Sequence, residues 1–251
     1  MRVYIGTSGW VYKSWDKTFY PADAPKSHQF QFYVTQFPTV EINATFYRLP
    51  TLHMSRGWRD KAPPGFVYAV KGSRFITHMK QLVNLGGGLT RFFKRLKPMQ
   101  ARIGVVLWQL PPRMEMDLER LENFLKKLPE DYHHAVEFRH RSWMDKSTFT
   151  LLRRYKAAHA SVSSLRMPMD LTVTSRLVYI RFHGLENGAA HDYTRKELEP
   201  WAEHVRHQAA QGKKVFAYFN NDANVRAPAN ARLFMEMTGA LREEPAYAEA
   251  A

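Results

Sequence analysis

The sequence contains no cysteine, which excludes disulfide bonds, thiolate metal ligands and a cysteine nucleophile. No apolar run approaches the roughly 20 residues that a membrane-spanning helix needs. Residues 1–7 lead directly into a predicted strand and lack the hydrophobic region of a signal peptide. These absences predict a soluble, cytoplasmic protein that has no membrane partner.

Acidic residues are scarce in one part of the chain. The whole sequence has 37 Lys and Arg against 23 Asp and Glu, a net charge of +14. Between positions 42 and 114 there are thirteen Lys and Arg but a single acid, Asp60. This basic segment is either a solvated face that aids solubility or a surface that attracts an anion, such as a phosphorylated metabolite or a nucleic acid.

Short apolar segments rich in β-branched residues alternate with amphipathic segments along the 251 residues, of which 45% are hydrophobic. Eight strands are predicted, over residues 3–7, 40–43, 66–71, 103–109, 135–139, 159–163, 177–183 and 215–220. Strands that alternate with helices form parallel sheets, so we predict an α/β fold, a single (β/α)8 TIM-type barrel. An open doubly wound sheet is the alternative, but no G-x-G-x-x-G motif follows the first strand.

The sixth crossover differs from the others. Residues 164–176 show no helical stripe, so an irregular connection is expected there. No Pro-, Gly- or Ser-rich linker divides the chain, which predicts one domain over residues 1–243. The Ala- and Glu-rich residues 244–251 are expected to form a flexible tail.

Six of the eight predicted strands end in large polar side chains, whereas the same strands begin with apolar ones. These strand-end residues are Glu41, Asn43, Lys71, Gln109, Glu137, Arg139, Arg181, His183, Asn220, Asn221 and Asp222. Parallel strands place all their carboxyl ends at one rim of a barrel, where barrel enzymes bind their substrates. The alternative is an internal ion-pair network, with Glu41 paired to Lys71 and Glu137 paired to Arg139 or Arg181.

Three strand-end residues are the candidates for catalysis. Glu41 and Glu137 could form a general acid/base pair whose pKa values are split by neighbouring cations, with His183 relaying protons. The same three residues with Asp222 could instead bind a divalent metal as a cofactor. The remaining candidates are assigned to substrate binding: Asn43, Lys71, Gln109, Arg139, Arg181, Asn220, Asn221 and Asp222.

Several motifs together identify a family. They are Thr7-Ser8-Gly9-Trp10, Val40-Glu41-Ile42-Asn43, Thr45-Phe46-Tyr47-Arg48-Leu49-Pro50, Gln109-Leu110-Pro111-Pro112, Val136-Glu137-Phe138-Arg139-His140, Tyr179-Ile180-Arg181-Phe182-His183-Gly184 and Tyr218-Phe219-Asn220-Asn221-Asp222. The chain resembles the YecE-like family, also called domain of unknown function 72. The resemblance implies a TIM-type barrel and no established reaction. One departure is Ser163-Ser164-Leu165, where many members have an Asp-Ser-Pro-like end to the sixth strand.

These observations favour an enzyme that acts on a small anionic substrate, phosphorylated or sugar-like, by carboxylate acid/base or metal-assisted chemistry of the isomerase or hydrolase type. Lys71, Arg139 and Arg181 would bind the anion. A second hypothesis is a nucleic-acid-binding protein or phosphodiesterase that uses the basic residues 48–102. A third is a barrel that sequesters a ligand without catalysis.

Overall fold

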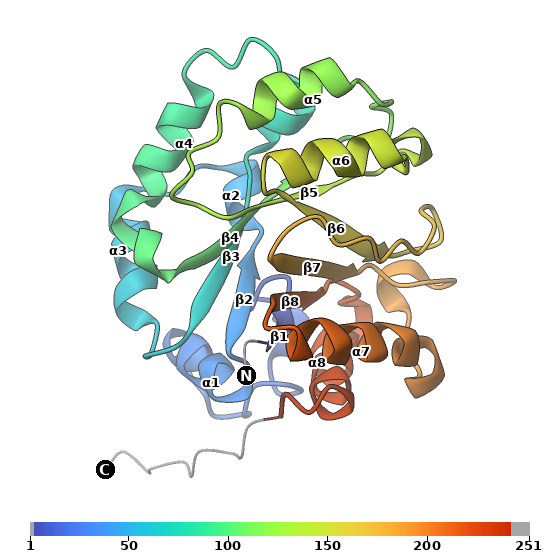
Figure 1. The fold of residues 1–251 in the computed structure, drawn as a ribbon. Coiled ribbons are helices and arrows are strands. Elements are labelled where there is room, and N and C mark those ends of the chain that lie inside the picture. Colours follow the sequence, from blue (N-terminus) through green and yellow to red (C-terminus); the bar gives the residue numbers. More distant parts are fainter. Residues whose placement is uncertain (1–2, 242–251) are drawn as a thin grey trace.

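The computed structural model describes residues 3–241, and in this range eight parallel strands wrap into a nearly closed barrel (Figure 1). The strands are β1 (Val3–Thr7), β2 (Thr39–Ile42), β3 (Val67–Lys71), β4 (Ile103–Gln109), β5 (His134–Glu137), β6 (Ala158–Ser163), β7 (Leu177–Phe182) and β8 (Lys214–Phe219). Each strand pairs with its sequence neighbours except at the seam between β1 and β2, and β1 pairs with β8. The predicted (β/α)8 barrel is therefore confirmed. The predicted tail at 244–251 lies outside the described residues.

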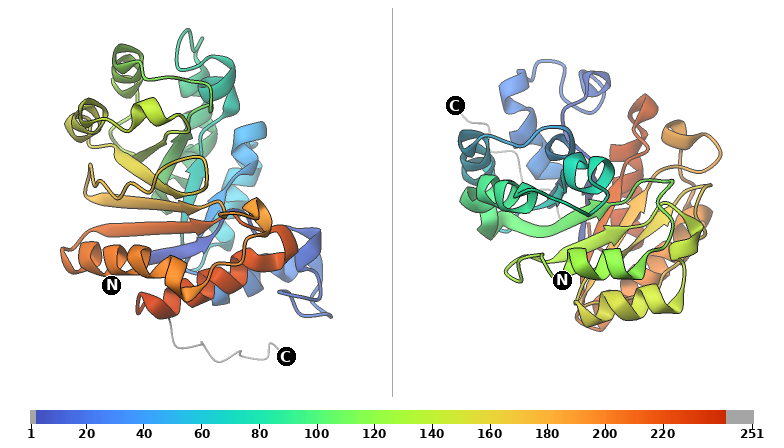
Figure 2. Two further views of the ribbon diagram at one scale, coloured as in Figure 1. Left: turned by 90° about the vertical axis from the view of Figure 1, so that its right-hand side faces the viewer. Right: turned by 90° about the horizontal axis from the view of Figure 1, so that it is seen from above.

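Helices surround the barrel on its outer side (Figures 1 and 2). They are α1 (Gln29–Gln36), α2 (Ala44–Tyr47), α3 (Leu52–Lys61), α4 (Gly88–Leu96), α5 (Leu118–Leu125), α6 (Lys146–Arg154), α7 (Arg195–Ala210) and α8 (Arg226–Met237). Local sequence sets several of their starts, because short polar side chains accept hydrogen bonds from otherwise unpaired backbone N–H groups. Asp117 caps α5 in this way, and Thr194 and Glu197 form a capping box at α7.

The crossover from β6 to β7 is irregular, as predicted, and contains no helix in residues 164–176. Its last part runs beside the start of β6. The hydroxyl of Thr174 accepts a hydrogen bond from the backbone N–H of His159 and donates one to the carbonyl of Ala157, each at 2.7 Å. An extended segment therefore lies between α6 and α7, where the other crossovers of this half of the barrel place a helix (Figure 1).

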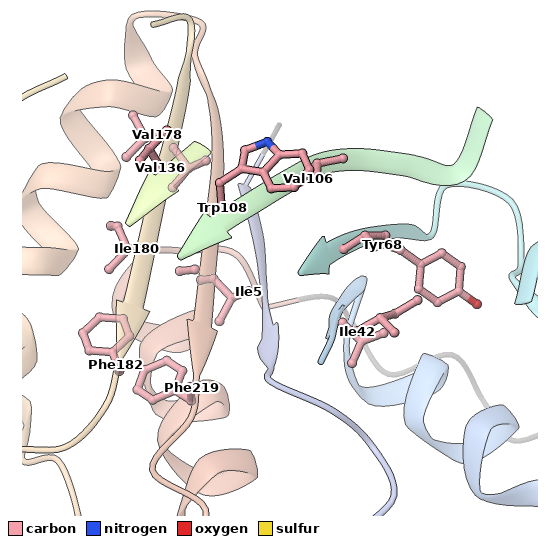
Figure 3. Close-up of a cluster of buried hydrophobic side chains, with 14 of the residues drawn as sticks. Ile5, Ile42, Tyr68, Val106, Trp108, Val136, Val178, Ile180, Phe182 and Phe219 are labelled. Carbon is pink, nitrogen blue, oxygen red and sulfur yellow. The ribbon is translucent and has the colours of Figure 1, made fainter. Parts of the chain in front are cut away.

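The core has two layers because side chains alternate along each strand. On β7, Val178, Ile180 and Phe182 face the helices and join the outer apolar cluster (Figure 3). The intervening Tyr179 lies in a second cluster inside the barrel, and Arg181 follows it on the same face. Burying each large apolar side chain contributes about 1.5–3 kcal/mol, so the outer layer is the main source of stability.

The seam between β1 and β2 is held by a side chain. The backbones approach so closely that a Cβ atom at Gly6 would lie 2.2 Å from the carbonyl oxygen of Thr39. The hydroxyl of Tyr33, from α1, accepts a hydrogen bond from the N–H of Thr7 at 3.0 Å and donates one to Thr39 at 3.0 Å. Among the described residues the only strand bridge across this seam joins Ser8 and Glu41, so Tyr33 takes the place of missing backbone hydrogen bonds.

We expect Tyr33→Phe to lower the free energy of unfolding by about 2–4 kcal/mol, because it leaves the buried N–H of Thr7 and the carbonyl of Thr39 without this partner. Urea denaturation measures the change. Tyr47→Phe is the control, since Tyr47 is 69% exposed and its hydroxyl loss should change stability by less than about 0.5 kcal/mol. Equal stability of the two variants would contradict the role of Tyr33.

Candidate active site at the carboxyl ends of the strands

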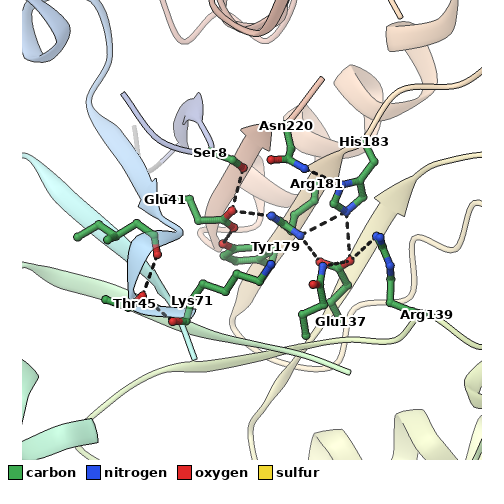
Figure 4. A network of polar contacts seen from close by, with 12 residues as sticks. Ser8, Glu41, Thr45, Lys71, Glu137, Arg139, Tyr179, Arg181, His183 and Asn220 are labelled. Carbon is green, nitrogen blue, oxygen red and sulfur yellow. Dashed lines mark hydrogen bonds and ion pairs between the residues drawn. The ribbon is translucent and has the colours of Figure 1, made fainter. Parts of the chain in front are cut away.

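Arg181 lies at the centre of the polar strand ends (Figure 4). Its Nη2 atom donates to Oε1 of Glu41 at 2.7 Å, and its Nη1 atom donates to Oε2 of Glu137 at 2.6 Å. The side chain of Arg181 is 1% exposed, and those of both glutamates are fully buried. Glu41 therefore pairs with Arg181, which reaches it from β7, and not with Lys71 on the neighbouring strand.

Each oxygen of Glu41 has further donors. Oε1 also accepts a hydrogen bond from the hydroxyl of Ser8 at 2.8 Å, and Oε2 accepts one from the hydroxyl of Tyr179 at 2.5 Å. Ser8 follows β1 and Tyr179 comes from β7, two residues before Arg181. The Glu41 carboxylate is therefore held by three side chains in the interior of the barrel.

Glu137 is held by four side chains. Its Oε1 atom accepts hydrogen bonds from Nε2 of Gln109 and Nη1 of Arg139, both at 2.8 Å. The Nε2 atom of His183 lies 3.1 Å from the same oxygen. With Arg181 on Oε2, residues from or directly after β4, β5 and β7 converge on one carboxylate. Six of the predicted strand-end residues are joined through the two glutamates, and Asn220 joins the network as a seventh through His183 (Figure 4).

The network keeps both carboxylates ionised. Burial by itself would raise the pKa of Glu41, but the charge of Arg181 and the hydrogen bond from Tyr179 lower it below the usual value. Burial likewise opposes the charge of Glu137, yet the charge of Arg181, the hydrogen bond from His183 and the charge of Arg139 hold its pKa well below the usual value. The two pKa values shift in the same direction and are not split as the sequence analysis expected.

His183 is neutral in this setting. Burial is the main cause that lowers its pKa, and the charge of Arg181 adds to the effect against the opposing carboxylate of Glu137. Its Nδ1 atom lies 3.1 Å from Nδ2 of Asn220. A neutral ring that accepts from Asn220 at Nδ1 and donates to Glu137 from Nε2 satisfies both contacts, so Asn220 orients the ring of His183.

Lys71 lies beside the network without joining it. Its Nζ atom is 4.2 Å from the centre of the Phe46 ring, and within residues 3–241 it makes no ion pair or hydrogen bond. Burial and the nearby charge of Arg181 lower its pKa to about 8, in spite of Glu137 and Glu41. With this pKa about a tenth of the amine is unprotonated at pH 7, against less than about a thousandth for an ordinary lysine.

Three predicted substrate-binding residues lie apart from the network. The side chain of Asn221 donates to the carbonyl of His191 at 2.8 Å and to Asn230 at 2.7 Å, so it joins the loop before α7 to α8. Asn43 has helical backbone angles directly before α2, which breaks the expected alternation with Glu41. Asp222 accepts from the indole N–H of Trp15 at 2.7 Å, and burial raises its pKa to about 6.

The proposed metal ligands do not come together as a set. Glu41 and Glu137 are separated by the guanidinium of Arg181, while Asp222 is bound to Trp15. Within the described part of the chain, no three His, Asp or Glu side chains are grouped so that they could hold a metal ion. The residues present therefore do not fit the divalent metal site that their sequence positions suggested.

Four residues near the site are not among the strand-end candidates, although the family motifs contain three of them, Ser8, Phe46 and Tyr179. Tyr179 and Ser8 bind Glu41 directly, and Phe46 contacts both Lys71 and His78. Burial, followed by the charge of Lys71, lowers the pKa of His78. The alternation Tyr179-x-Arg181 could have revealed Tyr179, whereas Phe46 and His78 follow their strands in segments that sequence periodicity does not place.

Ser163, at the end of β6, differs from the family motif and forms a side-chain hydrogen bond. The hydroxyl of Ser163, which stands where many relatives were expected to have an acid, accepts a hydrogen bond from Tyr193 at 2.8 Å. Ser163 is buried and lies on the face of β6 opposite to Ala160 and Val162. This serine is therefore directed toward the outer layer of the barrel and away from Arg181.

The chain was compared with known proteins. The family model described as "Protein of unknown function DUF72" matches residues 4–250. UPF0759 protein YunF of Bacillus subtilis is 25% identical over 94% of both chains. UPF0759 protein YecE of Escherichia coli K12 is 30% identical over 55% of this chain and 48% of its own length. A crystal structure of a DUF72 family protein from Thermotoga maritima, 28% identical, superimposes with a TM-score of 0.86 over 95% of this chain and all of that one.

Within residues 3–241, no helix has both the length and the apolar character to cross a bilayer.

The ion network predicts a distinctive pH dependence. Because the folded pKa values of Glu41 and Glu137 lie below their unfolded values, their contribution to stability is present above about pH 4.3 and is lost as the pH falls further. In Arg181→Met, burial without this cation raises the folded pKa of Glu41 above its unfolded value. The variant should therefore lose about 3–5 kcal/mol at pH 7, and less at pH 5.

Urea unfolding of the wild type and Arg181→Met at pH 5, 6, 7 and 8 measures this difference. The stability gap should widen as the pH rises. Arg206→Met is the control, because Arg206 and its partner Glu199 have side chains that are 43% and 48% exposed, and its loss should cost less than about 1 kcal/mol at every pH. A gap that narrows between pH 5 and 8 would rule out the assigned charge states.

Proposed function

The chain belongs to the DUF72 family of proteins of unknown function, and we propose that it is an enzyme that transfers protons on a small anionic substrate at the carboxyl ends of the barrel strands. The observation that carries the proposal is the amine of Lys71. It lies partly buried beside Arg181, Glu41 and Glu137, with no ion pair or hydrogen bond among the described residues. Lysines in such surroundings serve as general bases because their pKa is close to neutral pH.

The two glutamates take a supporting role in this proposal. Both are ionised and their oxygens accept hydrogen bonds from Arg181 and from other side chains, so neither carboxylate is poised to donate a proton. Their fixed charges set the potential at Lys71. Glu41 and Glu137 are thus proposed to act through Arg181 and Lys71, as positioning residues, and not as an acid/base pair.

Charge and exposure support an anionic substrate. Lys71, Arg139 and Arg181 face the two carboxylates, so the cluster carries one excess positive charge when Lys71 is protonated. Arg181 is buried and occupied by both glutamates, whereas the side chain of Arg139 is 29% exposed and uses one nitrogen for Glu137. We propose that Arg139 binds the phosphate or carboxylate group of the substrate, and that His183 and Asn220 complete the polar wall.

The test follows exchange of carbon-bound hydrogen in heavy water by NMR, with a panel of phosphorylated sugars and of hydroxy and oxo acids. A panel member that raises the melting temperature should show exchange next to its carbonyl group, about 100-fold slower in Lys71→Met. Lys71→Arg should retain the thermal stabilisation but lose the exchange, because arginine keeps the charge and does not release its proton. The wild-type rate should rise with pH and level off above about 8, where Lys71 is unprotonated.

Lys80→Met is the matched control, since Lys80 also lies over a phenylalanine ring, 5.8 Å from the centre of Phe75, but outside the network. It should exchange at the wild-type rate. Wild-type exchange in Lys71→Arg would show that Lys71 supplies only charge. Absence of exchange with every stabilising compound would refute proton transfer as the function.

A second candidate function, nucleic-acid binding, is favoured by one surface feature. Four cations of the basic segment, Arg48, Arg91, Lys94 and Arg95, line a groove of about 550 Å³ beside α3 and α4. No acidic residue lines this groove. Side chains so arranged can contact successive phosphate groups of a nucleic acid.

This candidate predicts binding that weakens steeply with salt. Fluorescence anisotropy with a 20-nucleotide single strand and the matching duplex should show a loss of affinity of about 100-fold between 50 and 200 mM salt if four phosphates are contacted. Arg91→Ala/Lys94→Ala should reduce the salt slope by about two. Affinity independent of salt, or a slope unchanged in the variant, would exclude the groove as the binding surface.

A further inference from the structure

A basic cavity lies at the opposite end of the barrel from Arg181. It has a volume of about 760 Å³ and is formed where the chain enters β5, β6, β7 and β8. Small-molecule sites typically have volumes of about 300–1,000 Å³. The amino ends of barrel strands usually serve stability and not binding, so a cavity of this size here requires a physical explanation.

The irregular sixth crossover accounts for the space. Residues 173–177 form one wall of the cavity, in the interval between α6 and α7 that the crossover fills with an extended segment (Figure 1). Thr174 ties this segment to the start of β6. Because an extended chain is thinner than a helix with its side chains, a hollow remains beside it.

The cavity wall carries positive charge without compensation. Its charged side chains are Arg153, Lys156, Arg176, Lys213 and Lys214, and no Asp or Glu lines it. In the described residues the ion pairs include none of these five; Lys213 instead donates to the side chains of two glutamines. Cations that share a cavity repel each other, and a bound anion would relieve that repulsion.

The backbone of Lys156 supplies an independent observation. Helices α6, α7 and α8 end alike, with a residue of positive φ two positions after the last helical residue. That residue is Gly212 after α7 (φ 78°) and Gly239 after α8 (φ 65°), but Lys156 after α6 (φ 54°). Glycine is strongly favoured in this conformation. At this position the chain therefore has a lysine, with its cation at the wall of the cavity, in place of the glycine that the backbone conformation favours.

We propose that the basic cavity binds a small molecule that carries two or more phosphate groups. Five cations exceed the charge of one phosphate group, about two at pH 7, so a ligand with several phosphate groups balances the cavity better than a single phosphate. The volume accommodates an organic part in addition, and Val173 and Leu177 provide apolar wall for it. The site is distinct from the proton-transfer site, which lies at the carboxyl ends of the strands.

The test is calorimetric titration of the full chain with inorganic tripolyphosphate and with adenosine triphosphate at about 0.15 M salt. Both should bind, and Arg176→Ala/Lys214→Ala should weaken both at least tenfold. Lys156→Gly should weaken binding about fivefold or more, while it keeps or raises the melting temperature because glycine relieves the strained backbone. Reduced affinity in a variant that is not destabilised cannot be attributed to unfolding.

Lys17→Gly is the matched control, because Lys17 also has a positive φ, 62°, and does not line the cavity. It removes the same charge and the same kind of strain, and it should bind both probes with wild-type affinity. Three results would overturn the proposal. The first is that the wild type binds neither probe below about 1 mM. The second is that Lys156→Gly and Lys17→Gly bind the probes with equal affinity. The third is that an oligonucleotide displaces both probes at far lower concentration, which would indicate a nucleic-acid surface.

Discussion

The bridge that Arg181 forms between Glu41 and Glu137 is the interaction on which the carboxyl end of the barrel depends. Removing a carboxylate from water costs several kcal/mol, which only a close cation with full hydrogen bonding offsets. One guanidinium faces two carboxylates here, and the remaining negative charge is balanced by Arg139 and by donors from Ser8, Gln109 and Tyr179. These contacts therefore join side chains from or directly after five strands, β1, β2, β4, β5 and β7.

The same bridge explains why Lys71 is left without a partner. A guanidinium offers two parallel donors and can serve two carboxylates, whereas an ammonium group is a point charge. Arg181 binds one carboxylate oxygen of each glutamate. Its positive charge also lowers the pKa of Lys71. Lys71 is therefore held over Phe46 with a lowered pKa. The arrangement that stabilises the barrel end thus also leaves an amine with a lowered pKa and, among the described residues, without an ion pair.

The sequence predicted the barrel because strand alternation and polar strand ends are local patterns. The pattern of strand ends also predicted that polar side chains would meet at one rim, and seven of them share one network: Glu41, Gln109, Glu137, Arg139, Arg181, His183 and Asn220. Lys71 lies beside this network without a direct contact. The sequence could not predict which carboxylate meets which cation, since partners across a barrel depend on strand stagger, a property of the closed sheet. Asn43 does not join the network because its backbone angles are already helical before α2, which ends the alternation with Glu41. Asn221 instead donates to the carbonyl of His191 and to Asn230.

The two ends of the barrel differ mainly in whether their cations contact acidic side chains. At the carboxyl end the cations other than Lys71 contact carboxylates, so the cluster keeps one net positive charge. At the amino end five cations share a cavity that no acid lines. Like charges that share one cavity repel each other, and a bound anion relieves that repulsion. The two proposed ligands differ accordingly, a small anion at the carboxyl end and a multiply charged one at the amino end, although both ends belong to one barrel with a net charge of +14.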